Sequence, residues 1–153
     1  MSGWNAGDWE GLVSGSACPI CRVGKPLDTV LELGSCWLSC PKTAPTFGYC
    51  CLVLKRHAVE LHELEPAEAC AFMADIQRVS EALQSVTGAV KLNYEIHGNT
   101  IPHLHMHLYP RYRGDPFEGG PIDPRVSEGP LYSTDAYETY VEKLKESLAR
   151  APL

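Results

Sequence analysis

The stretch Ile101-Pro102-His103-Leu104-His105-Met106-His107-Leu108-Tyr109 places three histidines at alternate positions. Successive side chains of a β-strand point to opposite faces of a sheet, so we expect the histidines on one face and the apolar residues between them on the other. The chain has 6 histidines, and His97 adds a fourth to this segment. A solvated strand would vary its polar residues, so the repeat favours an active site in which three imidazoles lie along one groove.

Apolar patterns on the N-terminal side of this segment predict the rest of a sheet and a helix. Residues 30–40 predict two short strands broken near Gly34, and residues 50–54 predict a central strand. Between Pro66 and about Val86 apolar residues recur three or four apart, which predicts an amphipathic helix across one face of the sheet. The strands predicted over 90–96 and 103–110 complete the sheet, and the short connections favour antiparallel order.

The two ends of the chain follow different patterns. Residues 1–17 have no apolar period and predict an irregular lead-in. Glycines, prolines and aspartates between residues 113 and 130 predict a long loop or extended tail. Residues 135–148 then predict a second helix, capped by Ser133 or Thr134, that packs on its own domain or on a dimer partner.

Composition limits the class of protein. With 153 residues and 44% hydrophobic content, the chain suits one compact domain. A formal net charge of −6 and the lack of a Lys/Arg run weigh against a nucleic-acid partner. The sequence has no apolar run long enough for a membrane span and no N-terminal leader pattern, so we expect a cytoplasmic protein with no membrane partner.

The 7 cysteines are an odd number without a secretion signal, which argues against a disulfide framework. Cys36, Cys40, Cys50 and Cys51 lie in segments that predict strands, where a free cysteine packs like a small apolar residue. Cys18-Pro19-Ile20-Cys21 is a separate feature, because a Cys-x-x-Cys knuckle supplies two of the four ligands of a structural zinc site. A redox pair or two idle thiols are the alternatives.

The pattern His-apolar-His-apolar-His-apolar-apolar resembles the histidine triad (HIT) family of nucleotidyl hydrolases and transferases. The approach over residues 93–100 and the exit over 110–117 resemble the family's diadenosine tetraphosphate hydrolase-like branch. Residues 48–57 and 64–66 match the family's central strand and the start of its long helix. The likeness covers residues 18–120, between the lead-in 1–17 and an extended tail with a C-terminal helix over 121–153.

This resemblance implies an α+β fold, with an antiparallel sheet, one long helix across it and a C-terminal helix. It also implies a homodimer that extends the sheet, and a nucleotide as the small-molecule partner. His105 would attack the α-phosphorus of the nucleotide and form a nucleotidyl-histidine intermediate that water resolves. Imidazole suits this role because its reference pKa near 6.5 leaves it unprotonated near neutral pH. Neither a metal nor an organic cofactor is required for that step.

The resemblance also assigns supporting roles. His107 would neutralise charge on the non-bridging oxygens, beside His103 as the other flanking histidine, and Asn99 and Thr100 would donate to the leaving group or the transferred phosphate. Asn99 also suits a turn beside Gly98, and the two roles are compatible.

Asn93 and Arg111 are the candidate substrate contacts, although an arginine just after a strand is often solvent-facing. Tyr49 stands where many members carry a histidine, so that residue's contribution is replaced or lost here. The family's ribose contact has only approximate counterparts in Asp28 and Ser39.

For the knuckle, the resemblance supplies the two missing ligands. Related bacterial members use the histidine that ends the Lys-Arg-His segment and the first triad histidine, which implies structural zinc on Cys18, Cys21, His57 and His103. Such an ion would tie the knuckle to the sheet and hold His103 neutral beside His105.

Alternatives of three classes remain open at this point. Phosphorolysis, nucleoside phosphoramidate hydrolysis and nucleotidyl transfer use the same covalent histidine chemistry. A metalloenzyme would instead bind catalytic zinc through His103, His105 and His107, although steric crowding disfavours three neighbours on one ion. A non-enzymatic nucleotide-binding regulator is the third class, and the intact triad argues against it.

Overall fold

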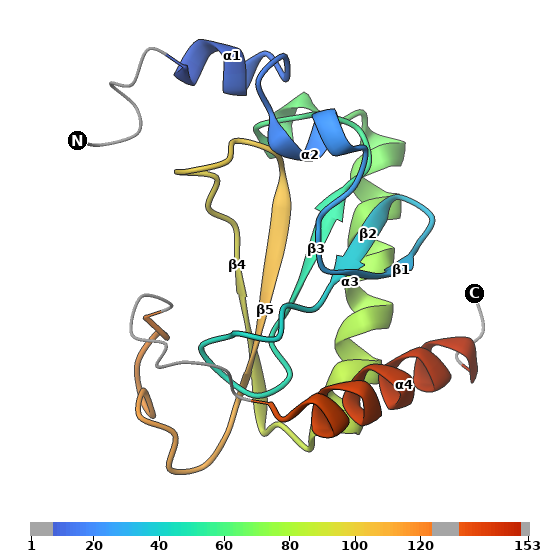
Figure 1. The fold of residues 1–153 in the computed structure, drawn as a ribbon, viewed down its shortest axis with the longest axis vertical. Helices are drawn as coiled ribbons and strands as arrows, with labels where there is room; N and C mark the ends of the chain where they lie inside the picture. The colour runs from blue at the N-terminus through green and yellow to red at the C-terminus, as the bar shows by residue number, and fades with distance from the viewer. Residues whose placement is uncertain (1–7, 124–131, 151–153) are drawn as a thin grey trace.

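The computed structural model describes residues 8–123 and 132–150. Its strands pair in the order β1-β2-β3-β5-β4, with every neighbouring pair antiparallel (Figure 1). This five-stranded sheet and its helices confirm the α+β fold. The elements are α1 Trp9–Val13, α2 Pro19–Val23, β1 Thr29–Glu32, β2 Cys36–Ser39, β3 Cys50–Leu54, a 3-10 turn Leu61–Glu63, α3 Pro66–Thr87, β4 Lys91–Glu95, β5 His105–Arg111 and α4 Thr134–Arg150.

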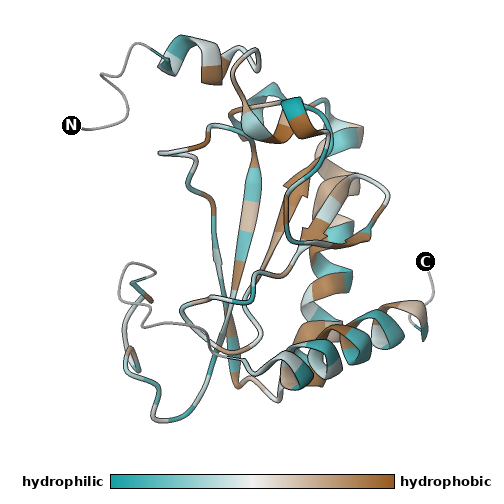
Figure 2. Cartoon of the chain, viewed as in Figure 1, coloured by the Kyte–Doolittle hydropathy of each residue, from teal (hydrophilic) through white to brown (hydrophobic). Residues whose placement is uncertain are grey.

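The two faces of the sheet have different surroundings, and β5 shows this best. Its Met106 and Leu108 belong to the buried core, as do Cys50 and Leu52 on the neighbouring β3. The residues between them point the other way, because side chains alternate along a strand. Hydrophilic and hydrophobic bands accordingly alternate along β5 in Figure 2, whereas β3 is hydrophobic throughout.

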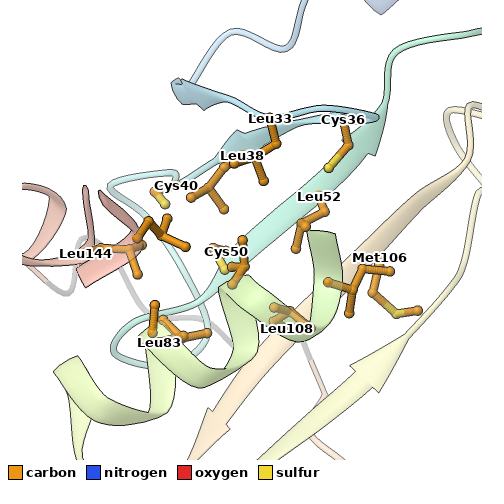
Figure 3. Close-up of a cluster of buried hydrophobic side chains, with 14 of the residues drawn as sticks. Leu33, Cys36, Leu38, Cys40, Cys50, Leu52, Leu83, Met106, Leu108 and Leu144 are labelled. Carbon is orange, nitrogen blue, oxygen red and sulfur yellow. The ribbon is translucent and has the colours of Figure 1, made fainter. Parts of the chain in front are cut away.

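Helix α3 covers the core face of the sheet. It begins at Pro66, a residue suited to a first helical turn, and ends before Gly88, whose φ of 68° is left-handed. Its buried stripe includes Phe72, Ile76 and Leu83. Figure 3 shows Leu83 of this helix in the same cluster as Cys50 and Leu108 of the sheet. Helix α4 lies across the end of α3 in Figure 1 and buries Leu144 in the same core. The C-terminal helix therefore packs on its own domain, which was one of its two expected positions.

Two details differ from the expectations. The lead-in is not wholly irregular: residues 9–13, which include a glycine, form the short helix α1. Strand β5 begins at His105, whereas the sequence predicts a strand from His103. The expected long loop is described as turns up to residue 123, and residues 124–131 lie outside the described part of the chain. No helix within 8–123 and 132–150 is both long and apolar enough to cross a membrane.

Candidate functional site

Two of the three alternating histidines stand together on the open face of the sheet. His105 pairs with Val53 of β3, and His107 pairs with Cys51 of β3 and Glu95 of β4. The two imidazoles meet edge to face, with ring centroids 4.5 Å apart. Both are only partly buried, and both border a cleft of about 1120 Å³, which is large enough for a nucleotide.

Segments that are far apart in the sequence line the cleft. The loop before β3 and the loop before β5 form its walls, and the predicted residues Asn99 and Thr100 are among its lining. Neither Asp28 nor Ser39, the candidate ribose contacts, is among the described residues that line it. The full lining is Pro41, Thr43, Pro45, Tyr49, Glu95, His97, Gly98, Asn99, Thr100, Ile101, His105, His107, Tyr109, Pro121, Ile122 and Asp123.

One hydrogen bond fixes the tautomer of His105. Its Nδ1 lies 2.6 Å from the backbone carbonyl oxygen of His103, and a carbonyl only accepts, so Nδ1–H is the donor. Burial lowers the pKa of His105 below its ordinary value, which favours the neutral ring. A neutral imidazole protonated at Nδ1 has its lone pair on Nε2, and this is the nitrogen available for attack.

Tyr49 favours the other tautomer in His107, with the proton on Nε2. Its hydroxyl lies 2.7 Å from Nδ1 of His107, and the two rings stack with centroids 5.9 Å apart. Burial raises the pKa of Tyr49, so the phenol keeps its proton and is suited to donate it. Burial also lowers the pKa of His107 to about 3, so its ring is neutral at pH 7. With Nδ1 accepting from Tyr49, the proton of His107 resides on Nε2.

The C-terminal helix reaches the site through Gly48, the residue before Tyr49. Gly48 has a φ of 79°, and a Cβ there would lie 2.5 Å from Thr87 Cγ2, so only glycine fits. The Tyr132 hydroxyl accepts from the Gly48 N–H at 2.5 Å, and the Tyr140 hydroxyl donates to the Gly48 carbonyl at 3.0 Å. The N–H and the carbonyl of Gly48 are therefore both anchored by tyrosines from the C-terminal segment.

His97 and Glu95 belong to the cleft, although the sequence analysis gives neither a role. The His97 Nε2 atom lies 2.8 Å from Glu95 Oε2, and the His97 ring is 5.3 Å from that of His107. Glu95 faces His107 across the β4–β5 pair. Only the register between these strands brings Glu95 to the site, which is why spacing within one strand did not identify it.

His103 lies elsewhere, and the expectation of three imidazoles in one groove is wrong for it. Its side chain is 1% exposed, and it does not line the cleft. Because β5 begins after it, His103 does not follow the alternation of the strand. Its ring instead lies against Cys18, Cys21 and His57, so the predicted zinc ligands come together as one cluster.

The distances within this cluster match a tetrahedral zinc site. Zn–S bonds near 2.3 Å and Zn–N bonds near 2.0–2.1 Å at tetrahedral angles separate S from N by about 3.6 Å and N from N by about 3.3 Å. Here Nδ1 of His103 lies 3.5 Å from Cys18 Sγ, 3.6 Å from Cys21 Sγ and 3.3 Å from His57 Nδ1. The edge from Cys21 Sγ to His57 Nδ1 is 3.3 Å, about 0.3 Å shorter than the S–N separation that these bond lengths give.

The hydrogen bonds around the cluster also fit a metal ion. Nε2 of His57 lies 2.9 Å from the Val13 carbonyl, and Nε2 of His103 lies 2.7 Å from the Leu54 carbonyl. Both rings therefore donate from Nε2, and their Nδ1 lone pairs face each other. Two lone pairs at 3.3 Å repel unless a cation lies between them, and such carbonyl partners are typical of zinc-bound histidines.

Arg111 and Asn93, the candidate substrate contacts, lie outside the histidine cleft and line a second hollow beside β4. All five N–H groups of Arg111 have internal partners. It donates to both carboxylate oxygens of Asp115, to Asn93 Oδ1 and to the carbonyls of Phe117 and Gly120. These bonds lower the pKa of Asp115 to about 2 and hold the loop after β5. A substrate contact for the two residues stays a prediction.

Comparison with known proteins places this geometry in a family. A sequence model of the HIT domain matches residues 25–114, more than half of the chain. The chain therefore belongs to the HIT family, whose members are generally nucleotide-processing proteins.

Solved structures agree with this assignment. A histidine triad protein from Bradyrhizobium japonicum is 28% identical, with a TM-score of 0.70 over 78% of this chain and 89% of that one. One from Sinorhizobium meliloti is 26% identical, with a TM-score of 0.69 over 78% and 87%. A zinc-bound histidine triad family protein from Mycobacterium smegmatis shares the fold at 23% identity, with a TM-score of 0.62 over 88% and 95%.

Two sequence relatives match a shorter region. An uncharacterised HIT-like protein from Methanocaldococcus jannaschii is 29% identical over 44% of this chain and 56% of its own length. The asymmetrical bis(5'-nucleosyl)-tetraphosphatase of Schizosaccharomyces pombe is 27% identical over 44% of this chain and 40% of its own length. The matches thus span about half the length of these relatives.

Proposed function

We propose that this chain is a nucleotidyl hydrolase that cleaves dinucleoside polyphosphates, or related nucleotide conjugates, at the α-phosphate. The observation that carries the proposal is the hydrogen bond from His105 Nδ1 to the His103 carbonyl, which leaves the Nε2 lone pair free. A neutral imidazole with a fixed free nitrogen is a competent nucleophile without a separate base. The Schizosaccharomyces pombe relative, a bis(5'-nucleosyl)-tetraphosphatase, supports the choice of substrate.

The reaction proceeds in two steps. His105 Nε2 attacks the α-phosphorus, the bond to the leaving phosphate oxygen breaks, and a nucleotidyl-histidine forms. Water then displaces the histidine and releases a nucleoside monophosphate. His107 is neutral, and its Nε2–H donates to a non-bridging phosphate oxygen beside the attacking ring. Such a positioned donor contributes about 3–4 kcal/mol to the transition state.

Asn99 and Thr100 are the proposed donors to the leaving group, because both line the cleft beside the histidine pair. Phosphorolysis, phosphoramidate hydrolysis and nucleotidyl transfer remain variants of the same proposal. They share the nucleotidyl-histidine and differ in the leaving group and the acceptor.

We also propose a structural zinc ion on Cys18, Cys21, His57 and His103. The support is the set of edges of 3.3–3.6 Å between their donor atoms. When bound, the ion would hold His103, whose carbonyl orients His105, and would tie α2 to the sheet. The Mycobacterium smegmatis protein of the same fold, which is zinc-bound, supports this proposal.

A homodimer is the proposed assembly. Strand β4 lies at one edge of the sheet. Val90, just before this strand, is 55% exposed, and Tyr94 within it is 48% exposed. A second copy of β4 pairing there would continue the antiparallel sheet and cover that edge. Light scattering coupled to gel filtration should give twice the chain's 16.8 kDa mass, and the single-chain mass would contradict the assembly.

The test of the activity is turnover of diadenosine tetraphosphate by the wild type and by His105→Asn, with products separated by chromatography. We expect adenosine monophosphate from the wild type and at least a 10⁴-fold slower release from the variant. Both proteins are assayed at one zinc per chain, the content of the Cys18, Cys21, His57 and His103 cluster, so that the loss is assigned to His105 itself. Unchanged turnover in the variant would contradict the proposed nucleophile.

A further inference from the structure

Cys51 differs from the other cysteines of the sheet. Cys36, Cys40 and Cys50 belong to the hydrophobic core, as the sequence predicts, whereas Cys51 lies outside that cluster. It stands directly opposite His107 in the β3–β5 pair, on the face that carries the cleft. Its thiol and one ring nitrogen from each of His105 and His107 lie within 4.8 Å of one another. A soft ligand and two imidazoles therefore converge beside the proposed nucleophile.

This donor set suits a divalent ion of the zinc class. One thiolate and two imidazoles are ligands that zinc prefers, and sites with three protein ligands keep a fourth position for water or a substrate atom. The 4.8 Å limit exceeds by about 1.2–1.5 Å the separations of about 3.3–3.6 Å that bound zinc requires. The backbone pairing places Cys51 directly opposite His107, and His105 lies two residues before His107 on the same strand, so rotation of the three side chains has to close that difference.

The surroundings also supply the outer hydrogen bonds that metal-bound histidines use. Nδ1 of His105 donates to the His103 carbonyl, which leaves Nε2 for an ion. Nδ1 of His107 contacts the Tyr49 hydroxyl, which can accept as well as donate. When the hydroxyl accepts, the proton of His107 is on Nδ1 and the lone pair on Nε2 is available to an ion.

We propose that Cys51, His105 and His107 form a second metal site, separate from the four-ligand cluster, whose occupation by a zinc-like ion inhibits the enzyme. The ion takes the lone pair that His105 uses for attack, and the thiol of Cys51 releases one proton to solvent on binding. The fourth position faces the cleft, where water or a phosphate oxygen completes the tetrahedron. The site has one ligand fewer than the cluster at Cys18 and is partly exposed, so it fills second.

Ion binding is tested directly, by equilibrium dialysis of the full chain against zinc followed by metal analysis. The wild type should bind two zinc ions per chain, and Cys51→Ala should bind one in the same range. Cys70→Ser is the matched control, because Cys70 is exposed on α3 and away from the cleft, and it should bind two. Loss of a ligand should weaken the second ion by more than the roughly 10–100-fold typical of outer-shell changes.

Two readouts guard against a folding defect. Cys51→Ala must retain its first zinc and its unfolding temperature, and Cys51→Ser, which keeps the volume of the side chain, should behave in the same way. Cobalt replaces zinc as a spectroscopic probe, and the second equivalent should add a thiolate-to-cobalt charge-transfer band that both Cys51 variants lack.

Inhibition rests on the proposed function and is measured separately. Each protein's turnover of diadenosine tetraphosphate at rising zinc is compared with its own zinc-poor rate, and the inhibitory midpoint should rise at least about tenfold in Cys51→Ala. One zinc per wild-type chain, two in both proteins, or equal midpoints would overturn the inference, and so would turnover that rises with the second ion. If no protein turns over this substrate, the proposed function fails while the dialysis still decides whether the site exists.

Discussion

His103 and His105 are two residues apart, yet their side chains work in opposite surroundings. Nδ1 of His103 lies 3.3–3.6 Å from three other ligand atoms, so the donors of that cluster converge on one point. His105 and His107 each use Nδ1 in a hydrogen bond and turn the rest of the ring towards an open cleft. Converging lone pairs favour a metal ion, whereas a single free lone pair beside a cleft favours a nucleophile.

The two regions are nevertheless joined by one backbone group. The carbonyl of His103 accepts from His105, so the residue proposed to hold zinc also fixes the tautomer of the proposed nucleophile. The comparison teaches that alternate histidines need not form one site. The start of β5 between them decides which face each ring occupies.

The largest expected effect separates the two regions by stability. Cys18→Ser removes one ligand from the four-atom cluster, and we expect loss of zinc and a free energy of unfolding lower by about 3–5 kcal/mol. Cys18 is fully buried, so water cannot take the place of the lost ligand or hydrogen-bond the new hydroxyl. Thermal unfolding with and without a chelator measures this. The control Cys70→Ser should stay within about 0.5 kcal/mol of the wild type, and a chelator-insensitive wild type would contradict a structural role for zinc.

A change in the pair His105 and His107 should lower activity and leave stability unchanged. His107→Leu removes the proposed donor to the phosphate, and kcat should fall by about 10²–10³-fold, while the zinc of the Cys18, Cys21, His57 and His103 cluster and the unfolding temperature are preserved. Steady-state kinetics and metal analysis on the same preparation are the measurements. A variant that loses the zinc of the Cys18, Cys21, His57 and His103 cluster together with activity would show that the two regions are not separate.

Tyr49→Phe tests how His107 is oriented. The hydroxyl contributes one neutral hydrogen bond at 2.7 Å, so its loss should lower kcat by about tenfold, or about 1.4 kcal/mol, with little change in KM. Tyr137→Phe is the matched control, because it also removes one hydroxyl hydrogen bond, to the Cys40 carbonyl, and Tyr137 does not line the cleft. Equal rates for the two variants would contradict the proposal that Tyr49 orients His107.

The smallest effect is expected at the far end of β5, outside both clusters. The pKa of Asp115 is lowered to about 2 by Arg111, so its ionised form stabilises the fold above its ordinary pKa of 3.8, and that contribution is lost as the pH falls towards 2. Asp115→Asn should cost about 1 kcal/mol in urea unfolding at pH 7 and progressively less below pH 4.

Glu146→Gln is the control for Asp115, because its ion pair with Arg150 is exposed and should contribute under about 0.5 kcal/mol. Neither variant should change zinc content or turnover. A constant difference between Asp115→Asn and the wild type from pH 7 to pH 2 would contradict the ionic role of Asp115.

Most of the fold followed from apolar spacing, because one buried face per element leaves a period that sequence displays. The helix expected from Pro66 to about Val86 ends at Thr87, and the strand expected over 50–54 is β3. The short helix α1 has no buried residue and therefore no apolar period to predict it.

The candidate site was predictable only in part, because its residues depend on pairing between strands. Asn99 and Thr100 reach the cleft as expected, since their loop leads directly into β5. Glu95 and Cys51 come to His107 through the register of β4 and β3, which no spacing within one strand encodes. The direction of the His103 ring depended on where β5 begins, and the internal bonding of Arg111 depended on the turns after it.

The central claim is that His105 forms a covalent bond to the α-phosphorus. The most direct measurement is rapid acid-free quenching of the wild type with diadenosine tetraphosphate, followed by intact mass and peptide mapping. We expect one adenylyl group on the peptide that contains His105, formed and lost at the rate of turnover, and absent in His105→Asn. Turnover with the adenylyl group on another residue, or adenosine monophosphate release that persists in His105→Asn, would contradict it.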